Sequence, residues 1–262
     1  MKIIGQLRIK DWVYILGIPI LGFFYLSRFN ISYDFALMLI VSSLYLSHGY
    51  MLNDCFENIF GKSKDTKRKK IILSYSLLLL NCVITYLYLK SILPIVLLGS
   101  LLALVYSSRM KKNIISNIFL NSLGFSLLFL IGVLSNKPIG TEAIPLFLYV
   151  YLAFIPAQIM HILAHMEKEK VDIIFDERHL LMSVETFLLI FILWSFIIYY
   201  VFSQSILIFI STLVFSSLQI YLFEHMSIRK SFSVRKCNIF RNYTKVINIG
   251  LGISLLLIFI FL

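Results

Sequence analysis

The sequence predicts an all-α, polytopic membrane protein with nine transmembrane helices. The chain has 262 residues, of which 60% are hydrophobic and only 14% charged, whereas a soluble domain carries about 25% charged residues. The apolar residues form runs of about 18 residues or more, long enough to cross a hydrocarbon core of ~30 Å as helix. These runs are continuous rather than alternating in period two, which favours helices over a membrane β-barrel.

The first apolar run follows a short basic tail with Lys2, Arg8 and Lys10. Its length and the many runs after it favour a first spanning helix over a cleavable signal peptide. The fourth run is short, as expected of a tilted helix or one that starts in the headgroup layer. The predicted spans are Asp11–Phe29, Phe35–Asn53, Ile71–Leu89, Ile92–Tyr106, Ile114–Leu134, Ala143–His165, Val184–Phe202, Ser205–Phe223 and Val246–Leu262.

The basic residues support this number of spans. With the N-terminus placed in the cytoplasm, all but three of the 24 Lys and Arg residues lie on the inner side, the exceptions being Arg28, Lys90 and Lys137. Such asymmetry is the positive-inside pattern, and one helix more or fewer would scramble it. We therefore expect a multi-pass protein of the cytoplasmic membrane, with its N-terminus in the cytoplasm and its C-terminus outside.

The remaining composition narrows the class of protein. The net charge of +11 could indicate nucleic-acid binding, but in this composition it indicates loops against an anionic leaflet, with membrane lipids as partners and no nucleic acid. The three cysteines have no CxxC spacing, so neither a disulfide framework nor a zinc site is predicted. No repeat, linker or soluble segment interrupts the chain, and residues 1–262 are predicted to form a single transmembrane domain.

The first polar constellation lies where the second span ends. Asn53, Asp54 and Glu57 are at positions i, i+1 and i+4, so Asn53 and Glu57 share a helix face with Asp54 beside it. Acids at a helix C-terminus oppose the helix dipole, and either the following basic run or a bound cation should compensate them. Their hard oxygens suit Mg²⁺. The alternative is a solvated helix end followed by a positive-inside loop.

The second constellation starts within the sixth span and continues past its inner end. A helix places five of its polar residues on one stripe, at steps of three and four: Gln158, His161, His165, Glu169 and Asp172. Polar groups in a bilayer are costly and usually mark function. Two alternatives stay open, namely a polar seam satisfied by neighbouring helices and a transition-metal site that uses both histidines and Glu169.

The third constellation is the segment "YSSRMKK" at the inner end of the fourth span. Its cations and hydroxyls can hold phosphate through charge-assisted hydrogen bonds. The alternative is another positive-inside loop. The candidate residues here, with two asparagines near the start of the fifth span, are Tyr106, Ser107, Arg109, Lys111, Asn117 and Asn121.

Taken together, these motifs resemble the UbiA superfamily of intramembrane prenyltransferases. The family's NDxxDxxxD motif is matched by Asn53, Asp54 and Glu57, with Gly61 in place of the last Asp. Its DxxxD motif is matched by His165 and Glu169, with Asp172 one turn further on. Its YSxxLK motif is matched by Tyr106, Ser107, Met110 and Lys111. The order and spacing of the motifs cover the whole chain. The departures are the altered acids, together with Ile9 in place of the Pro of an RPxxW-like start.

The resemblance implies nine helices around a central cavity open to the cytoplasmic side, and Mg²⁺-dependent transfer of an isoprenyl group. The donor would be a prenyl diphosphate and the acceptor an aromatic or lipid molecule within the membrane. The resemblance assigns Mg²⁺ to Asp54, Glu57, Glu169 and Asp172, catalysis to Asp54, Glu57, His165 and Glu169, and phosphate neutralisation to Arg109, Lys111 and Lys62.

Two alternative functions remain beside prenyl transfer. The opening "LRIKDWV" with Pro19 is most similar to the phosphoribosyl-transferring branch, which indicates transfer of phosphoribose to a polyprenyl phosphate. The altered acids favour a non-catalytic lipid-binding or transport protein on the same scaffold. The sequence specifies neither the acceptor nor the prenyl chain length.

Overall fold

A computed structural model of the chain describes residues 7, 9–27, 31–57, 64–108, 113–136, 140, 143–169, 177–202, 205–226, 228 and 233–261. In these residues all regular secondary structure is helical. Eight helices are long and apolar enough to cross a membrane, and a shorter apolar helix, Val13–Tyr25, precedes them. The prediction of an all-α, multi-pass membrane protein is thereby confirmed. The chain divides into two compact units.

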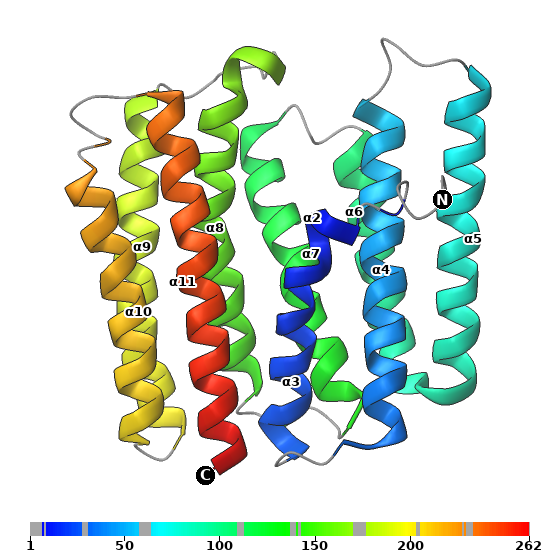
Figure 1. Ribbon diagram of the computed structural model, residues 1–262, viewed down its shortest axis with the longest axis horizontal. Coiled ribbons are helices and arrows are strands. Elements are labelled where there is room, and N and C mark those ends of the chain that lie inside the picture. Colours follow the sequence, from blue (N-terminus) through cyan, green and yellow to red (C-terminus); the bar gives the residue numbers. More distant parts are fainter. Residues whose placement is uncertain are drawn as a thin grey trace. The chain divides into compact units, whose positions relative to one another are not determined.

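Unit 1 comprises Met1–Lys111 and Leu127–Ile139. Its helix α4 packs against both α5 and α6, and Figure 1 shows α4 and α5 side by side, running in opposite directions. The end of α4, the start of α5 and the end of α6 therefore lie at the same end of unit 1. The elements of this unit are α2 (Ile9–Trp12), η1 (Val13–Leu16), α3 (Gly17–Ser27), α4 (Tyr33–Glu57), α5 (Lys64–Tyr88), η2 (Lys90–Ile92), α6 (Leu93–Ser108) and the second part of α7 (Ile114–Leu134).

Polar side chains join α5 to α4. The Ser74 hydroxyl lies 2.9 Å from Nδ1 of His48 and 3.1 Å from the His48 carbonyl oxygen, and one to two turns further on Asn81 donates to the carbonyl of Val41 at 3.2 Å. The opposite face of α5 exposes apolar side chains such as Leu79. Lipid is as apolar as leucine, so helix pairing in a membrane depends on close packing and on interhelical hydrogen bonds rather than on a hydrophobic driving force. These bonds fix the register of α5 against α4.

The backbones of α3 and α7 approach closely within unit 1. A Cβ atom at Gly22 would meet the carbonyl of Phe129, and one at Gly132 would meet the carbonyl of Pro19. Small residues permit such close packing of membrane helices. Because the atoms in the way are backbone atoms, no side-chain rotation could accommodate a larger residue at either position.

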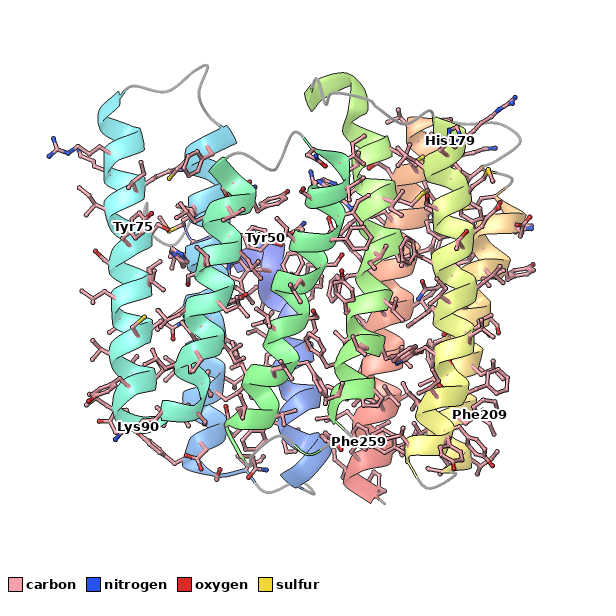
Figure 2. All side chains as sticks on the ribbon, turned by 180° about the vertical axis from the view of Figure 1, so that it is seen from behind. Tyr50, Tyr75, Lys90, His179, Phe209 and Phe259 are labelled. Atoms are coloured by element: carbon pink, nitrogen blue, oxygen red, sulfur yellow. The ribbon has the colours of Figure 1, made fainter. Side chains whose placement is uncertain are left out.

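Unit 2 comprises Lys112–Ser126 and Gly140–Leu262. In it α8 packs against α9 and α11, and α10 packs against the same two helices. Figure 2 shows His179 at one end of this unit and Phe209 and Phe259 at the other. Its elements are the first part of α7, α8 (Ala143–Glu169), α9 (Glu177–Val201), α10 (Ile206–His225) and α11 (Val234–Phe261).

The interior of unit 2 also contains polar groups in the middle of its helices. The Tyr149 hydroxyl lies 3.1 Å from the carbonyl oxygen of Thr212 and 3.2 Å from the hydroxyl of Ser216. Gln219 on α10 donates to the side-chain oxygen of Asn248 on α11 at 2.8 Å. Both units thus bury polar side chains among the apolar ones of their interiors and also expose large apolar side chains, as expected where the surrounding solvent is lipid.

The helix boundaries differ from the predicted spans mainly at the basic segments. The predicted span Ile114–Leu134 coincides with α7, whereas α5 begins at Lys64 rather than Ile71 and α11 begins at Val234 rather than Val246. The apolar run limits the part of a helix that lies in hydrocarbon, but it does not limit the helix itself. Long basic side chains can extend from such a helix end to the membrane interface.

Candidate functional site

The last turns of α4 carry Asn53 and Asp54, the first residues of the predicted metal-binding motif. Oδ2 of Asp54 accepts a hydrogen bond from Nζ of Lys70 on α5 at 2.9 Å, and these two side chains are only 15% and 11% exposed. A carboxylate at a helix C-terminus is unfavourable against the helix dipole. The Lys70 ammonium, which belongs to the basic run after α4, compensates the negative charge of Asp54.

Lys70 is the residue that sequence reasoning missed as a site residue. Its neighbours Arg68 and Lys69 are exposed, whereas Lys70 is buried. The available signal was periodicity, because Lys70, Ser74 and Asn81 recur at helical spacing along one face of α5. That face packs on α4. The sequence predicts the basic run after α4 as a positive-inside loop that can compensate the acids or bind phosphate, but composition alone does not distinguish its last lysine from the others.

The end of α6 brings hydroxyl groups to the same end of unit 1. Tyr106 and Ser107 lie on its last turns. Ser107 is buried, and its hydroxyl has no hydrogen-bond partner within the described part of the chain. Leaving a buried hydroxyl unsatisfied costs about 1–3 kcal/mol, so a polar ligand that reaches Ser107 would recover this cost. The predicted cations Lys62, Arg109 and Lys111 lie outside the described residues.

In unit 2, two of the predicted polar positions meet. Nδ2 of Asn121 on α7 donates to Oε1 of Gln158 on α8 at 2.9 Å. Asn117 is buried one turn before Asn121, and His161 is half-buried one turn after Gln158. Pro156 lies within α8 close to Gln158, and a proline inside a helix removes one backbone hydrogen bond. These residues form a polar seam along α7 and α8.

The acidic part of the second motif is only partly described. His165 and Glu169 lie on the last two turns of α8, but their side chains lie outside the described residues, as does the side chain of Glu57 at the end of α4. Asp172 is outside the described residues altogether. Among the described side chains, no three His, Cys, Asp or Glu residues gather in a way that could hold a metal ion. The magnesium ligands beyond Asp54 therefore stay predictions.

The donors at the end of α4 fit a single hard cation. Asp54 and Asn53 offer carboxylate and amide oxygens, the ligand types that Mg²⁺ prefers. An ionised carboxylate has about four acceptor positions, so the bond to Lys70 does not exhaust those of Asp54. Mg²⁺ is usually held by one or two carboxylates together with waters and substrate phosphates. One ion on Asp54, shared with the phosphates of a ligand, is consistent with this donor set.

Solved structures share this fold over its whole length. The chain superimposes on a digeranylgeranylglyceryl phosphate synthase with a TM-score of 0.79 at 20% identity, covering 100% of both chains. It also superimposes on a UbiA homologue from Archaeoglobus fulgidus bound to DMAPP and Mg²⁺, with a TM-score of 0.67 at 13% identity, covering 97% of this chain and 98% of the other. The same homologue bound to GPP and Mg²⁺ gives a TM-score of 0.68 at 13% identity, covering 98% and 99%.

No protein-family model matches the sequence, and no curated protein is significantly similar to it. At identities of 20% or less, the structural similarity shows the fold alone. The chain has the fold of the UbiA homologues, and the resemblance that the motifs indicated is confirmed at that level.

Proposed function

We propose that this protein transfers an isoprenyl group from a prenyl diphosphate to an aromatic or lipid acceptor within the membrane, with Mg²⁺ as cofactor. The observation that carries the proposal is the buried pair of Asp54 and Lys70 at the end of unit 1. It places an acid and a cation together in a chain whose full-length structural neighbours hold prenyl diphosphates with Mg²⁺.

The proposed roles follow the chemistry of the side chains. Asp54 with Glu57, and Glu169 with Asp172, would hold Mg²⁺, which on binding neutralises charge that develops on the departing diphosphate. His165 would donate a proton or a hydrogen bond to a phosphate oxygen. The residues proposed to bind and orient the diphosphate are Asn53, Lys62, Tyr106, Ser107, Arg109, Lys111, Asn117 and Asn121.

In this reaction the C–O bond of the prenyl diphosphate breaks, and its electron pair leaves with the diphosphate. The allylic carbon forms a new bond to the acceptor, and the proton that the acceptor loses is taken up by the released diphosphate. Fixed cations and hydrogen-bond donors stabilise the leaving group because they need no reorganisation at the moment of reaction. We propose that this chemistry takes place at the cytoplasmic face, with the N-terminus in the cytoplasm.

The test is an activity assay with matched acid variants. Purified protein in lipid nanodiscs is incubated with radiolabelled geranyl or geranylgeranyl diphosphate, Mg²⁺ and a panel of quinone precursors and glycerol-phosphate lipids. The wild type should form a product that EDTA abolishes, and Asp54→Asn should lose at least about 100-fold in rate, as expected for a group that stabilises the transition state. Asp34→Asn, which changes an acid in the first turn of α4, should stay active. No Mg²⁺-dependent product with any acceptor would refute the proposal.

A non-catalytic lipid-diphosphate-binding protein is the second candidate. The observation that favours it is the altered motif, in which Gly61 stands where the resembled motif has a further acid. Tight binding of geranyl diphosphate without turnover, in the assay above, would select this candidate. The phosphoribosyl alternative would instead be selected by product formed only from phosphoribosyl diphosphate and a polyprenyl phosphate.

A further inference from the structure

Lys70 has unused hydrogen-bonding capacity. An ammonium group carries three N–H donors, and in the described part of the chain Asp54 is the one recorded partner of Lys70. The side chain is 11% exposed, so its remaining donors are not simply solvated as those of a surface lysine would be. Asp54 holds the ammonium in place, and a fixed, partly desolvated cation interacts more strongly with an anion than a solvated one does.

The surroundings of Lys70 indicate what kind of anion it would take. Lys70 lies at the start of α5, at the end of unit 1 that also carries Ser107 on α6. The Ser107 hydroxyl is buried and has no hydrogen-bond partner in the described residues. Phosphate oxygens accept charge-assisted hydrogen bonds from an ammonium and ordinary ones from a hydroxyl, so the chemistry of both groups favours a phosphate-bearing ligand at this end of unit 1.

The altered motif gives this cation a further role. Where the resembled motif has a last acid, this chain has Gly61, and where the second motif begins with an acid it has His165. Fewer carboxylates hold fewer divalent ions, so less of the diphosphate charge can be neutralised by metal. An ammonium fixed on Asp54 is a positive charge that belongs to the protein and does not depend on the divalent ion concentration.

We propose that the Lys70 ammonium is a built-in cation of the diphosphate site: it bridges Asp54 and a phosphate oxygen, so that a diphosphate still binds when no divalent ion is present. This inference rests on the proposed function for its ligand class and adds a phosphate-binding residue that no motif assigns. Lys70 takes over at Asp54 part of the charge neutralisation that a second metal ion would supply.

The competing explanation is that Lys70 only neutralises Asp54 and contacts no ligand. The two explanations differ in the double variant Asp54→Asn/Lys70→Met, which removes both charges and leaves neither uncompensated. If Lys70 is only a counter-ion, the double variant binds diphosphate as the wild type does. If Lys70 contacts the ligand, the double variant folds well and still binds weakly.

The experiment measures binding in EDTA by calorimetry on the full chain in nanodiscs. The probes are inorganic pyrophosphate and geranyl S-thiolodiphosphate, which separate binding of the diphosphate group from binding of the prenyl chain. The wild type should bind both without metal, and Lys70→Met should bind about 10- to 100-fold more weakly, the range for losing a hydrogen bond to a charged group. Lys70→Arg should keep most of the affinity, and Lys69→Met, which removes an exposed charge next to it, should bind as the wild type.

Each outcome decides the inference. A wild type that loses all binding in EDTA, a Lys70→Met variant with wild-type affinity, or a double variant with wild-type affinity would each overturn it. The transfer assay with Mg²⁺ runs beside the binding assay on the same preparations. Lys70-dependent binding without any product would uphold the inference and refute the transferase, whereas product formation with no effect of Lys70→Met on binding would do the reverse.

Discussion

The close approach of α3 and α7 leads to a prediction about stability. Substituting Gly132→Ala would place a Cβ atom against the carbonyl of Pro19 and the amide nitrogen of Phe23. In a helix interior the change from Gly to Ala by itself stabilises by about 1 kcal/mol, while overpacking costs about 1–3 kcal/mol. Because both obstructing groups are backbone, α3 itself must move, and we expect the upper end of that cost. The expected net loss is about 2 kcal/mol.

The matched control is Gly17→Ala in the same unit. A Cβ atom at Gly17 meets nothing within 4 Å, and the backbone there is right-handed helical, so this substitution should be neutral or stabilise by up to about 1 kcal/mol. The predicted difference between the two variants is therefore about 2–3 kcal/mol. It arises from packing, because the chemical change is the same.

Thiol reactivity provides the assay. Cys55 is buried in α4 of unit 1, so in a Cys82→Ser/Cys237→Ala background a thiol-reactive fluorophore reports the opening of that unit on heating. Gly132→Ala should lower the labelling midpoint by several degrees, and Gly17→Ala should leave it unchanged or raise it. Equal midpoints for the two variants would show that α3 and α7 do not pack as closely as described.

Two further stability predictions can be checked by the same thermal assay. Lys70→Met and Asp54→Asn should each destabilise by about 3–5 kcal/mol because each leaves a largely buried charge uncompensated, whereas the double variant should regain most of this loss; additive losses would contradict the ion pair. Gln219→Leu should be nearly neutral: the bond lost to Asn248 is worth about 0.6 kcal/mol, the fully buried Gln219 oxygen without a partner in the described residues is removed, and the Asn248 oxygen that loses its donor belongs to a half-buried side chain. Asn248→Leu should cost about 1–3 kcal/mol because it leaves the Gln219 amide without that acceptor. Here the reporter is Cys237 in a Cys55→Ala/Cys82→Ser background, and equal effects of the two variants would contradict this asymmetry.

The buried Asp54–Lys70 pair links topology to chemistry. The positive-inside rule predicts a basic run after α4, but it does not specify which of the basic residues pairs with Asp54. The structure selects Lys70 and leaves Arg68 and Lys69 exposed. In the predicted topology the exposed residues of this run orient the protein in the membrane, while the buried Lys70 serves the proposed site.

Much of the fold could be predicted from the sequence, because the bilayer imposes a local rule. Every spanning segment must be helical and roughly as long as the hydrocarbon core is thick, so apolar runs reveal helices without knowledge of their neighbours. The span Ile114–Leu134 coincides with α7 for this reason. The ends were less predictable, because α5 and α11 extend beyond their apolar runs through basic residues.

The sequence alone therefore determined the class of protein, the order of its helices and the polar positions worth considering. Only the tertiary structure decided which polar groups meet: Lys70 with Asp54, and Asn121 with Gln158. The physical reason is that a side chain's partner depends on the register and rotation of two packed helices. These are set by contacts far apart in sequence, such as the bond of Asn81 to the Val41 carbonyl.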